Sequence, residues 1–219
     1  MKNYLFKDKI EKKVRIGKII CLARSYRKHA EEMNQIVTNN PLIFLKPASS
    51  VIFNDESIII PKISKCLHHE VELGVVINKK CKGVEQKRAL NYVLGYCVAL
   101  DITARDIQDE AKKFGWPWTI AKGFDTFAPI SEVVLKEKIK NPNNLDLFLK
   151  VNGKFRQNSN TKYMIYSVEK IIEFISGIMT LEEGDLILTG TPEGVGEILK
   201  GDILEAKLGS FCSLKVDVR

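Results

Sequence analysis

Residues 68–78 form an apolar segment that carries two acids near its start. Its aliphatic, β-branched composition predicts a largely buried strand. Side chains alternate between the two faces of a strand, so Glu70 and Glu72 should point one way while His69 and Val71 point the other. Two buried carboxylates without partners cost several kcal/mol or take up a proton. A divalent cation bound at this strand face would remove that conflict.

A second apolar segment, residues 92–103, predicts a long buried strand with Asp101 near its end. Glu70, Glu72 and Asp101 could then offer three carboxylates to one point, a pattern that indicates a metal site. All-oxygen ligation favours Mg²⁺, Mn²⁺ or Ca²⁺ over zinc, and three acids leave coordination positions for water or substrate.

The composition limits the classes of protein to which this chain can belong. The chain has 219 residues, of which 45% are hydrophobic and 28% charged, as in a globular protein. Residues 1–9 are too charged for a signal peptide and no run approaches a membrane span, so we expect a cytoplasmic protein without a membrane partner. Five cysteines without a CxxC pair indicate reduced core thiols. Zinc at residues 66–69 is an alternative that lacks a second Cys/His cluster to complete a tetrahedral site.

The net charge of +7 raises the alternative of a basic module that binds nucleic acid or an anionic partner without turnover. The lysines are scattered, however, and no basic helix or interleaved aromatic motif is present. We therefore expect no nucleic-acid partner. The charge can still help to attract an anionic substrate.

The remaining pattern is rich in strands and poor in helices. Strands are expected at residues 17–23, 42–47, 57–61, 145–156 (a hairpin turning at Asn152-Gly153), 185–189, 202–207 and 211–218, and helices at 26–37, 85–91, 106–114 and 167–175, the last capped by Ser167 and stopped by Gly177. A regular βαβ alternation is missing. The fold class is therefore predicted as mainly β with short helices (α+β), in a closed or rolled architecture.

The expected helix 26–37 is mostly polar, as in a lid, and carries His29 and Glu32 three residues apart on one face. A carboxylate that holds a histidine fixes its tautomer and raises its basicity, so His29 could take a proton from water. The simpler interpretation is a surface contact worth a few tenths of a kcal/mol.

Three more segments could contact an anion. Arg105 and Gln108 begin a predicted helix just after Asp101, and Lys122 follows a Trp-Pro-Trp turn. A cation beside a dication is repelled unless an anion lies between them, although ordinary helix-end charges explain the spacing equally well. Residues 189–196 form a glycine-rich loop without the P-loop frame, either a ligand cradle or a structural tight turn.

Several segments, taken in order, resemble the fumarylacetoacetate hydrolase family, and most closely its small acylpyruvate hydrolase and oxaloacetate decarboxylase branch. These segments are residues 24–26, 29–33, 44–47, 68–72, 100–108, 121–125 and 188–196. The resemblance covers roughly residues 15–218. It implies a mixed β-sandwich roll of the fumarylacetoacetase C-terminal-domain type, usually a homodimer, with residues 1–14 as an N-terminal segment and 15–219 as one catalytic domain.

The resemblance also implies roles for individual residues. The metal, Mg²⁺ or Mn²⁺ with Ca²⁺ as a third candidate, would be held by Glu70, Glu72 and Asp101. The catalytic residues would be His29 and Glu32, as a water-activating dyad, and Lys122, as the cation beside a developing enolate. The substrate-binding residues would be Arg24, Arg105, Gln108 and Thr191. Ser25 departs from the asparagine that many members have, which puts any polar contact there in doubt.

The implied activity is a metal-dependent hydrolase and decarboxylase of small 2-oxo acids. It would cleave acylpyruvates (2,4-dioxo acids) to pyruvate and a carboxylate, decarboxylate oxaloacetate, or do both, through a metal-bound enolate. The alternative is an isomerase, tautomerase or decarboxylase of 2-hydroxy-dienedioates from aromatic degradation, which needs the same metal but no activated water.

Overall fold

A computed structural model describes residues 2–8, 13–32 and 40–219 of the chain. The strands are β1 (Ile19–Ala23), β2 (Leu42–Lys46), β3 (Val51–Ile52), β4 (Ser57–Ile58), β5 (Leu67–His69), β6 (Val71–Ile77), β7 (Val93–Leu100), β8 (Thr103–Ala104), β9 (Ala128–Pro129), β10 (Val134–Leu135), β11 (Asp146–Val151), β12 (Lys154–Asn160), β13 (Leu186–Leu188), β14 (Gly196–Ile198), β15 (Ile203–Leu208) and β16 (Cys212–Val218). The α-helices are α1 (Arg27–Glu32), α2 (Arg105–Phe114), α3 (Thr119–Lys122) and α4 (Val168–Ile178), with 3₁₀ turns at Ala48–Ser50, Gln86–Tyr92, Lys136–Lys138 and Thr161–Tyr163.

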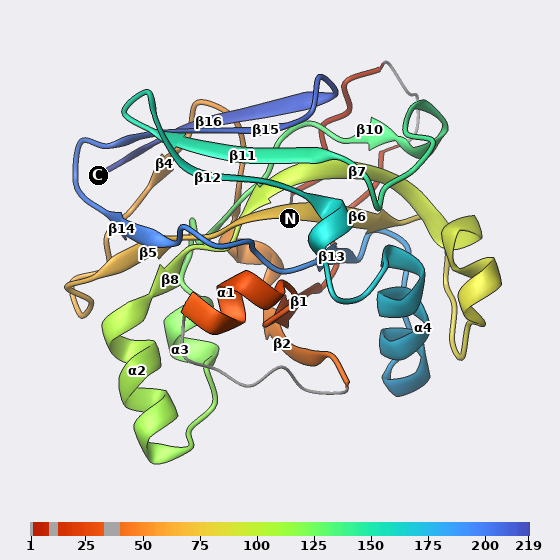
Figure 1. Ribbon diagram of the computed structural model, residues 1–219, viewed down its shortest axis with the longest axis horizontal. Helices are drawn as coiled ribbons and strands as arrows, with labels where there is room; N and C mark the ends of the chain where they lie inside the picture. The colour runs from red at the N-terminus through yellow and green to blue at the C-terminus, as the bar shows by residue number, and fades with distance from the viewer. Residues whose placement is uncertain (1, 9–12, 33–39) are drawn as a thin grey trace.

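Two large sheets face each other, and a small sheet lies at one end beside α2 (Figure 1). The six-stranded sheet has the order β10-β7-β6-β13-β1-β2, the five-stranded sheet β12-β11-β15-β16-β4, and the small sheet β14-β5-β8, while β3 pairs with β9. Most neighbours are antiparallel, but β1–β13, β3–β9 and β16–β4 are parallel. The predicted class, mainly β with short helices in a mixed β-sandwich, is confirmed.

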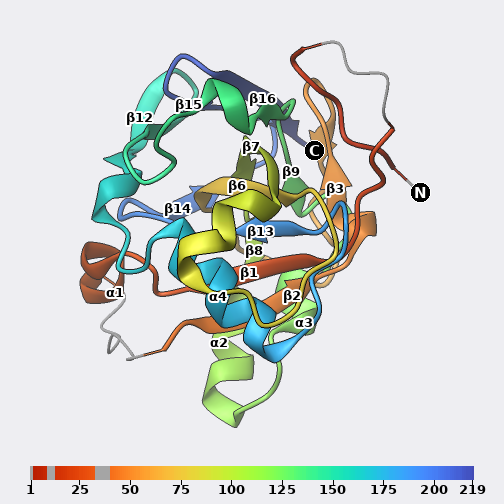
Figure 2. The same ribbon diagram turned by 90° about the vertical axis from the view of Figure 1, so that its right-hand side faces the viewer.

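The main core lies between the two large sheets. Strands β11, β15 and β16 alternate buried and more exposed residues, so one face of their sheet, with Leu147, Leu204 and Leu214, packs inward. Strand β6 is buried along its whole length because its other face meets a second core that includes Val76 and Tyr4. The N-terminal residues run along this flank beside β3 (Figure 2), where the Lys2 ammonium donates to a β3 carbonyl.

Local predictions hold where a short-range signal decides them. The hairpin turns at Asn152 and Gly153, both with positive φ, as a two-residue turn requires. The Ser167 hydroxyl caps α4 by accepting the Lys170 N–H. The predicted stop at Gly177 is wrong, because α4 continues through it to Ile178.

Two other predicted helices can be compared with the structure. The short helix predicted at residues 85–91 is present as a 3₁₀ helix, Gln86–Tyr92. Of the predicted helix 26–37, the structure shows Arg27–Glu32, while residues 33–37 lie outside the described part of the chain. In the described residues no helix is long and apolar enough to cross a membrane.

Candidate active site

The two strands that carry the predicted acids change sheets together. β5 pairs with β8 in the small sheet, and β6 pairs with β7 in the six-stranded sheet. The change falls at Glu70 on one chain segment and at Asp101 on the other, and the Asp101 N–H donates to the Glu70 carbonyl at 2.8 Å. The strand predicted around Glu70 is therefore interrupted at Glu70, and the strand predicted to end near Asp101 is interrupted at Asp101. The chain bends at both points, and the hydrogen bond between the two main-chain groups sets the spacing of the Glu70 and Asp101 carboxylates.

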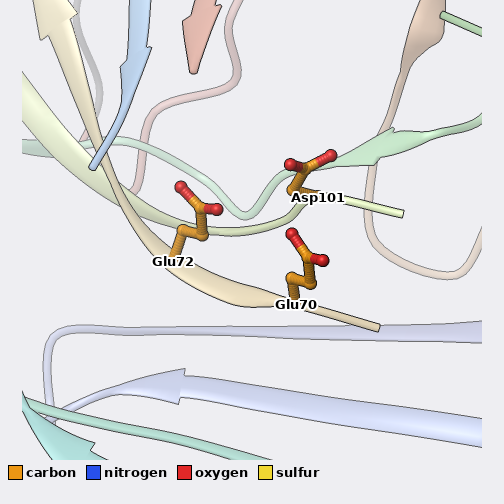
Figure 3. A group of neighbouring side chains, drawn as sticks. All are labelled: Glu70, Glu72 and Asp101. Carbon is orange, nitrogen blue, oxygen red and sulfur yellow. The ribbon is translucent and has the colours of Figure 1, made fainter. Parts of the chain in front are cut away.

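Glu70, Glu72 and Asp101 each offer a carboxylate oxygen, and these oxygens lie within 4.8 Å of one another (Figure 3). All three side chains are buried. Burial, together with the charges of Asp101 and Glu70, raises the pKa of Glu72 well above its usual value. Three buried acids that repel one another are stabilised by a bound dication, so the donors present fit a hard metal ion such as Mg²⁺ or Mn²⁺.

Buried cations surround the acids. The Lys122 ammonium lies 2.9 Å from a Glu70 oxygen and 2.5 Å from an Asp101 oxygen, and the Arg105 guanidinium lies 2.5 Å from the other Glu70 oxygen. Burial alone would raise the pKa of Glu70, but Lys122 and Arg105 hold it well below its usual value. Burial lowers the pKa of Lys122, and the charges of Asp101 and Glu70 more than offset that effect, so its pKa is raised. Arg105 and Lys122 are therefore not solvated helix-end charges.

Lys46 is a third buried cation beside the acids, and the sequence pattern did not single it out. Its side chain is fully buried, and its ammonium donates to the carbonyls of Ile102, Lys122 and Phe127 at 2.6–3.0 Å. The same nitrogen lies 2.8 Å from an Asp101 oxygen. Burial lowers the pKa of Lys46, and the charge of Asp101 opposes that shift. The signal in the sequence was a lysine that ends an apolar strand.

A small pocket opens above the acids. It is lined by Leu22, Ala23, Arg24, His29, Phe44, Glu70, Glu72, Arg105, Gln108, Lys112, Trp118, Lys122 and Thr191. Arg24 has a φ of 59°, a left-handed conformation that is uncommon for a residue with a Cβ and that is found at functional sites. Of the ten predicted site residues, this pocket is lined by all except Glu32 and Asp101.

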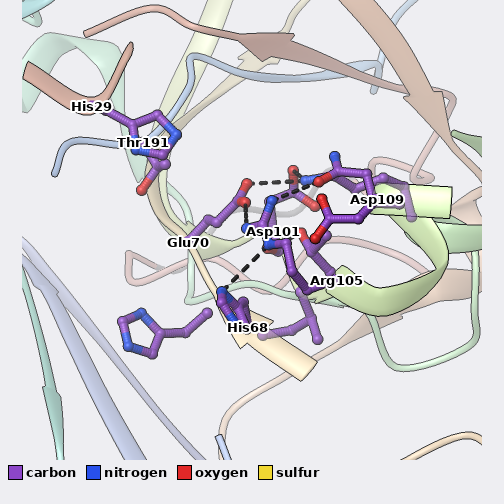
Figure 4. A network of polar contacts seen from close by, with 12 residues as sticks. His29, His68, Glu70, Asp101, Arg105, Asp109 and Thr191 are labelled. Atoms are coloured by element: carbon purple, nitrogen blue, oxygen red, sulfur yellow. Dashed lines mark hydrogen bonds and ion pairs between the residues drawn. The ribbon is translucent and has the colours of Figure 1, made fainter. Parts of the chain in front are cut away.

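His29 and Glu32 lie on α1 as the spacing predicts. The His29 Nδ1 is 3.4 Å from a Glu32 carboxylate oxygen, and both His29 and Thr191 line the pocket that Glu70 enters (Figure 4). The His29 side chain is mostly buried, whereas that of Glu32 is exposed. Both Glu32 oxygens also accept the Gly194 N–H, at 3.1 and 3.2 Å, so Glu32 links α1 to the glycine-rich loop.

Hydrogen bonds fix the orientation of Gln108. Arg105 donates to the Gln108 side-chain carbonyl at 2.5 Å, so the amide NH₂ of Gln108 is left as a donor. Arg105 also donates to Nδ1 of His68 at 3.3 Å, which requires a neutral imidazole. Burial and the Arg105 charge lower the pKa of His68 to about 4, which agrees with that protonation state.

Thr191 is held by Gln157, a residue on β12 that the sequence reasoning missed. The Gln157 amide donates to the Thr191 hydroxyl at 2.8 Å and accepts from the Val71 N–H at 3.0 Å, while its oxygen lies 3.1 Å from the Nδ1 of His69. The Thr191 hydroxyl in turn donates to the Val71 carbonyl at 2.9 Å. The Thr191 proton is thus engaged by the main chain, and Thr191 lines the pocket.

The zinc alternative finds no support. His69 points toward Gln157 and His68 toward Arg105, so the two neighbouring imidazoles diverge as strand alternation requires. Among the described residues, the group of His, Cys, Asp and Glu side chains that gathers around one point is the set of three acids. The five cysteines are free, and all except Cys66 are buried.

A β-sandwich with three clustered acids, flanking cations and a lined pocket defines a carboxylate-ligated, divalent-metal class of enzyme. Comparison of the sequence with known families gives the same result more specifically. The chain belongs to the fumarylacetoacetate hydrolase family, whose profile, described as "Fumarylacetoacetate (FAA) hydrolase C-terminal", matches residues 18–219.

Individual relatives span nearly the whole chain. The oxaloacetate tautomerase FAHD1, mitochondrial, of Homo sapiens is 48% identical over 200 residues, which cover 91% of this chain and 90% of that protein. The crystal structure of fumarylpyruvate hydrolase from Pseudomonas aeruginosa in complex with Mn²⁺ and pyruvate has a TM-score of 0.94 at 31% identity and covers 98% of this chain and 94% of that chain. A 2-hydroxyhepta-2,4-diene-1,7-dioate isomerase from Mycobacterium marinum has a TM-score of 0.83 at 36% identity, with 94% and 75% covered.

Proposed function

We propose that this protein is a divalent-metal-dependent enzyme that cleaves acylpyruvates, decarboxylates oxaloacetate, or does both. The observation that carries the proposal is the cluster of three buried acids whose flanking cations, Lys122 and Arg105, reach into the same pocket. The buried cations Lys46, Lys122 and Arg105 match the three acids in number of formal charges, and their ion pairs are with Glu70 and Asp101. A dication therefore leaves the site with a net positive charge, which an anionic chelating substrate neutralises.

When bound, the metal would supply Lewis acidity that polarises the 2-oxo group of the substrate. The protein side chains supply the rest. Lys122 holds a buried positive charge where negative charge develops as the enolate of pyruvate leaves. The NH₂ group of Gln108 is oriented to donate to a substrate oxygen, and Arg24 and Thr191 complete the substrate contacts.

Hydrolysis of an acylpyruvate also needs water to attack the 4-carbonyl. His29 is the group that we assign to take the proton from that water, with Glu32 holding its Nδ1 so that Nε2 is the basic nitrogen. The contact of Glu32 with the Gly194 N–H keeps this dyad over the pocket. Decarboxylation of oxaloacetate forms the same enolate by loss of CO₂ and needs no such water.

Tautomerisation or isomerisation is the second candidate function. Sequence similarity supports this candidate. The human oxaloacetate tautomerase is 48% identical to this chain, whereas the Pseudomonas aeruginosa fumarylpyruvate hydrolase is 31% identical. The reaction moves a proton between carbon and oxygen of the same 2-oxo acid skeleton. In that case His29 would carry the proton and no water would be consumed.

The test is a substrate panel with metal control. Purified protein is treated with a chelator and assayed with acetylpyruvate, oxaloacetate and a 2-hydroxy-dienedioate, before and after adding back Mg²⁺, Mn²⁺ or Ca²⁺. We expect turnover of at least one 2-oxo acid that disappears on chelation and returns with metal. Product analysis identifies hydrolysis, decarboxylation or tautomerisation. Undiminished turnover by fully metal-free protein would refute the proposal.

We further propose a homodimer formed through the edge strand β2. A groove of about 1050 Å³ runs along β2 and the 116–119 turn, and Leu42, Leu45 and Trp116 are exposed on it. An apolar face on an unpaired sheet edge favours association, and a second copy of the chain supplies a matching edge. Light scattering should give twice the chain mass of 24.8 kDa, and a Leu45→Glu variant should be a monomer. A monomeric wild-type protein would contradict this.

The unit that carries the activity is proposed to be residues 15–219, with residues 1–14 as an N-terminal segment. The compartment is proposed to be the cytoplasm, because five free cysteines suit a reducing environment.

A further inference from the structure

Helix α2 directs a row of polar side chains along the pocket. Arg105, Gln108 and Lys112 are spaced three and four residues apart, so they share one face of the helix, and all three line the pocket. Arg105 contacts the metal-ligand acid Glu70. Lys112 lies about one helical turn, or 5.4 Å, beyond Gln108 along the axis. The row therefore extends from the acids toward the outer part of the pocket.

Lys112 and Lys122 both line the pocket, but their ammonium groups have different ion-pair partners. The ammonium of Lys122 is buried between two carboxylates at 2.5 and 2.9 Å. The Lys112 ammonium forms one ion pair in the described structure, with Asp109 at 3.3 Å, whose side chain is 61% exposed. Such a contact between neighbours on a helix surface contributes only a few tenths of a kcal/mol. The charge of Lys112 therefore remains available to a ligand.

The surroundings of Lys112 favour an anion. Its side chain is 25% exposed, and its ammonium lies 6.0 Å from the centre of the Trp118 ring, which forms a wall of the pocket. Burial and the positive charge of Arg105 lower the pKa of Lys112. Two cations that face one pocket repel each other, and a carboxylate placed between them relieves the repulsion.

We infer that Lys112 binds the second carboxylate of those substrates that carry one remote from the three acids, and so favours dicarboxylic 2-oxo acids such as oxaloacetate over monocarboxylic ones such as acetylpyruvate. This inference rests on the proposed function and specifies its substrate class. The first carboxylate and the 2-oxo group face the acids, Gln108 and Lys122. The far end of a four-carbon or longer chain then extends along α2 toward Lys112.

The test compares two ligands that differ at one end. Oxaloacetate and 2-oxobutanoate share a four-carbon chain that ends in a carboxylate in the first and a methyl group in the second. Each is measured as a substrate or as a competitive inhibitor in wild type, Lys112→Met and Lys112→Arg. Lys113→Met is the matched control, because Lys113 is the next residue, is exposed and does not line the pocket.

Loss of a charge-assisted contact should weaken oxaloacetate binding in Lys112→Met by about 10-fold or more, seen in KM or the inhibition constant with a smaller change in kcat. Binding of 2-oxobutanoate should change by less than about 3-fold. Lys112→Arg should recover part of the loss, and Lys113→Met should match wild type.

These outcomes distinguish a failure of the role assigned to Lys112 from a failure of the proposed function. Equal losses for both ligands, or no loss for either, overturn the role of Lys112 while the proposed function stands. A wild-type protein that neither turns over nor binds any 2-oxo acid overturns the proposed function, and the role of Lys112 with it.

Discussion

Substituting Lys46 by methionine is expected to lower the free energy of unfolding by about 3–5 kcal/mol, because one partner of a buried ion pair is removed. The Lys46 ammonium donates to three main-chain carbonyls and forms an ion pair with an Asp101 oxygen, all in the interior. Methionine has a similar length but cannot donate, so these acceptors would be left without that donor. Denaturant unfolding of metal-free protein measures the change without any contribution from bound metal.

Lys18→Met is the matched control for this experiment. The Lys18 ammonium also pairs with a buried acid, Asp185, but its side chain is 31% exposed. After the substitution Asp185 still accepts the N–H groups of Lys18 and Glu182. We expect a loss of about 1 kcal/mol or less. If Lys46→Met cost no more than Lys18→Met, the buried ammonium would not be an essential support of the acid cluster.

Replacing His29 with alanine is expected to reduce acylpyruvate hydrolysis by about 100-fold or more, the usual contribution of a general base. The effect should fall on kcat, because His29 acts on water in the reaction and does not hold the substrate. Oxaloacetate decarboxylation should be much less affected, since it consumes no activated water. The measurement is steady-state kinetics on both substrates with the same metal.

Two variants control for the position of His29. Glu32→Gln keeps the shape of the partner but weakens its hold on Nδ1, so it should cause a smaller loss than His29→Ala. Lys28→Ala alters the neighbouring residue, whose side chain is 76% exposed and 3.8 Å from Glu193, and should leave kcat unchanged. Unchanged acylpyruvate hydrolysis in His29→Ala would remove the dyad from the mechanism. A loss confined to tautomerisation would instead assign His29 as a proton carrier.

The shared face of Glu70 and Glu72 was predictable because strand alternation acts over a few residues. The hairpin at Asn152-Gly153 and the cap at Ser167 rest on equally local signals. Asp101 was expected in the cluster because it ends a second apolar run, but the antiparallel pairing of β6 with β7 that brings it there is a long-range contact.

Other parts of the site depend on contacts between distant residues. Lys46 meets carbonyls that are 56 to 81 residues away, and Gln157 reaches Val71 and Thr191 across 86 and 34 residues. Apart from the place of Lys46 at the end of an apolar strand, no local pattern distinguishes these two side chains from a surface lysine or glutamine. The change of sheet at Glu70 and Asp101 was likewise hidden, because an apolar run predicts a strand but not its pairing partners.

That change of sheet separates two tasks within the molecule. The Asp101 N–H bonded to the Glu70 carbonyl fixes the distance between the two proposed metal ligands by backbone geometry, whereas α1, α2 and the 189–196 loop contribute groups from outside that bend. We expect substitutions in those outer elements to alter which molecule is accepted, and what happens to it, without moving the two carboxylates. This separation explains how relatives named tautomerase, hydrolase and isomerase can share one fold while differing in the reaction that their names state.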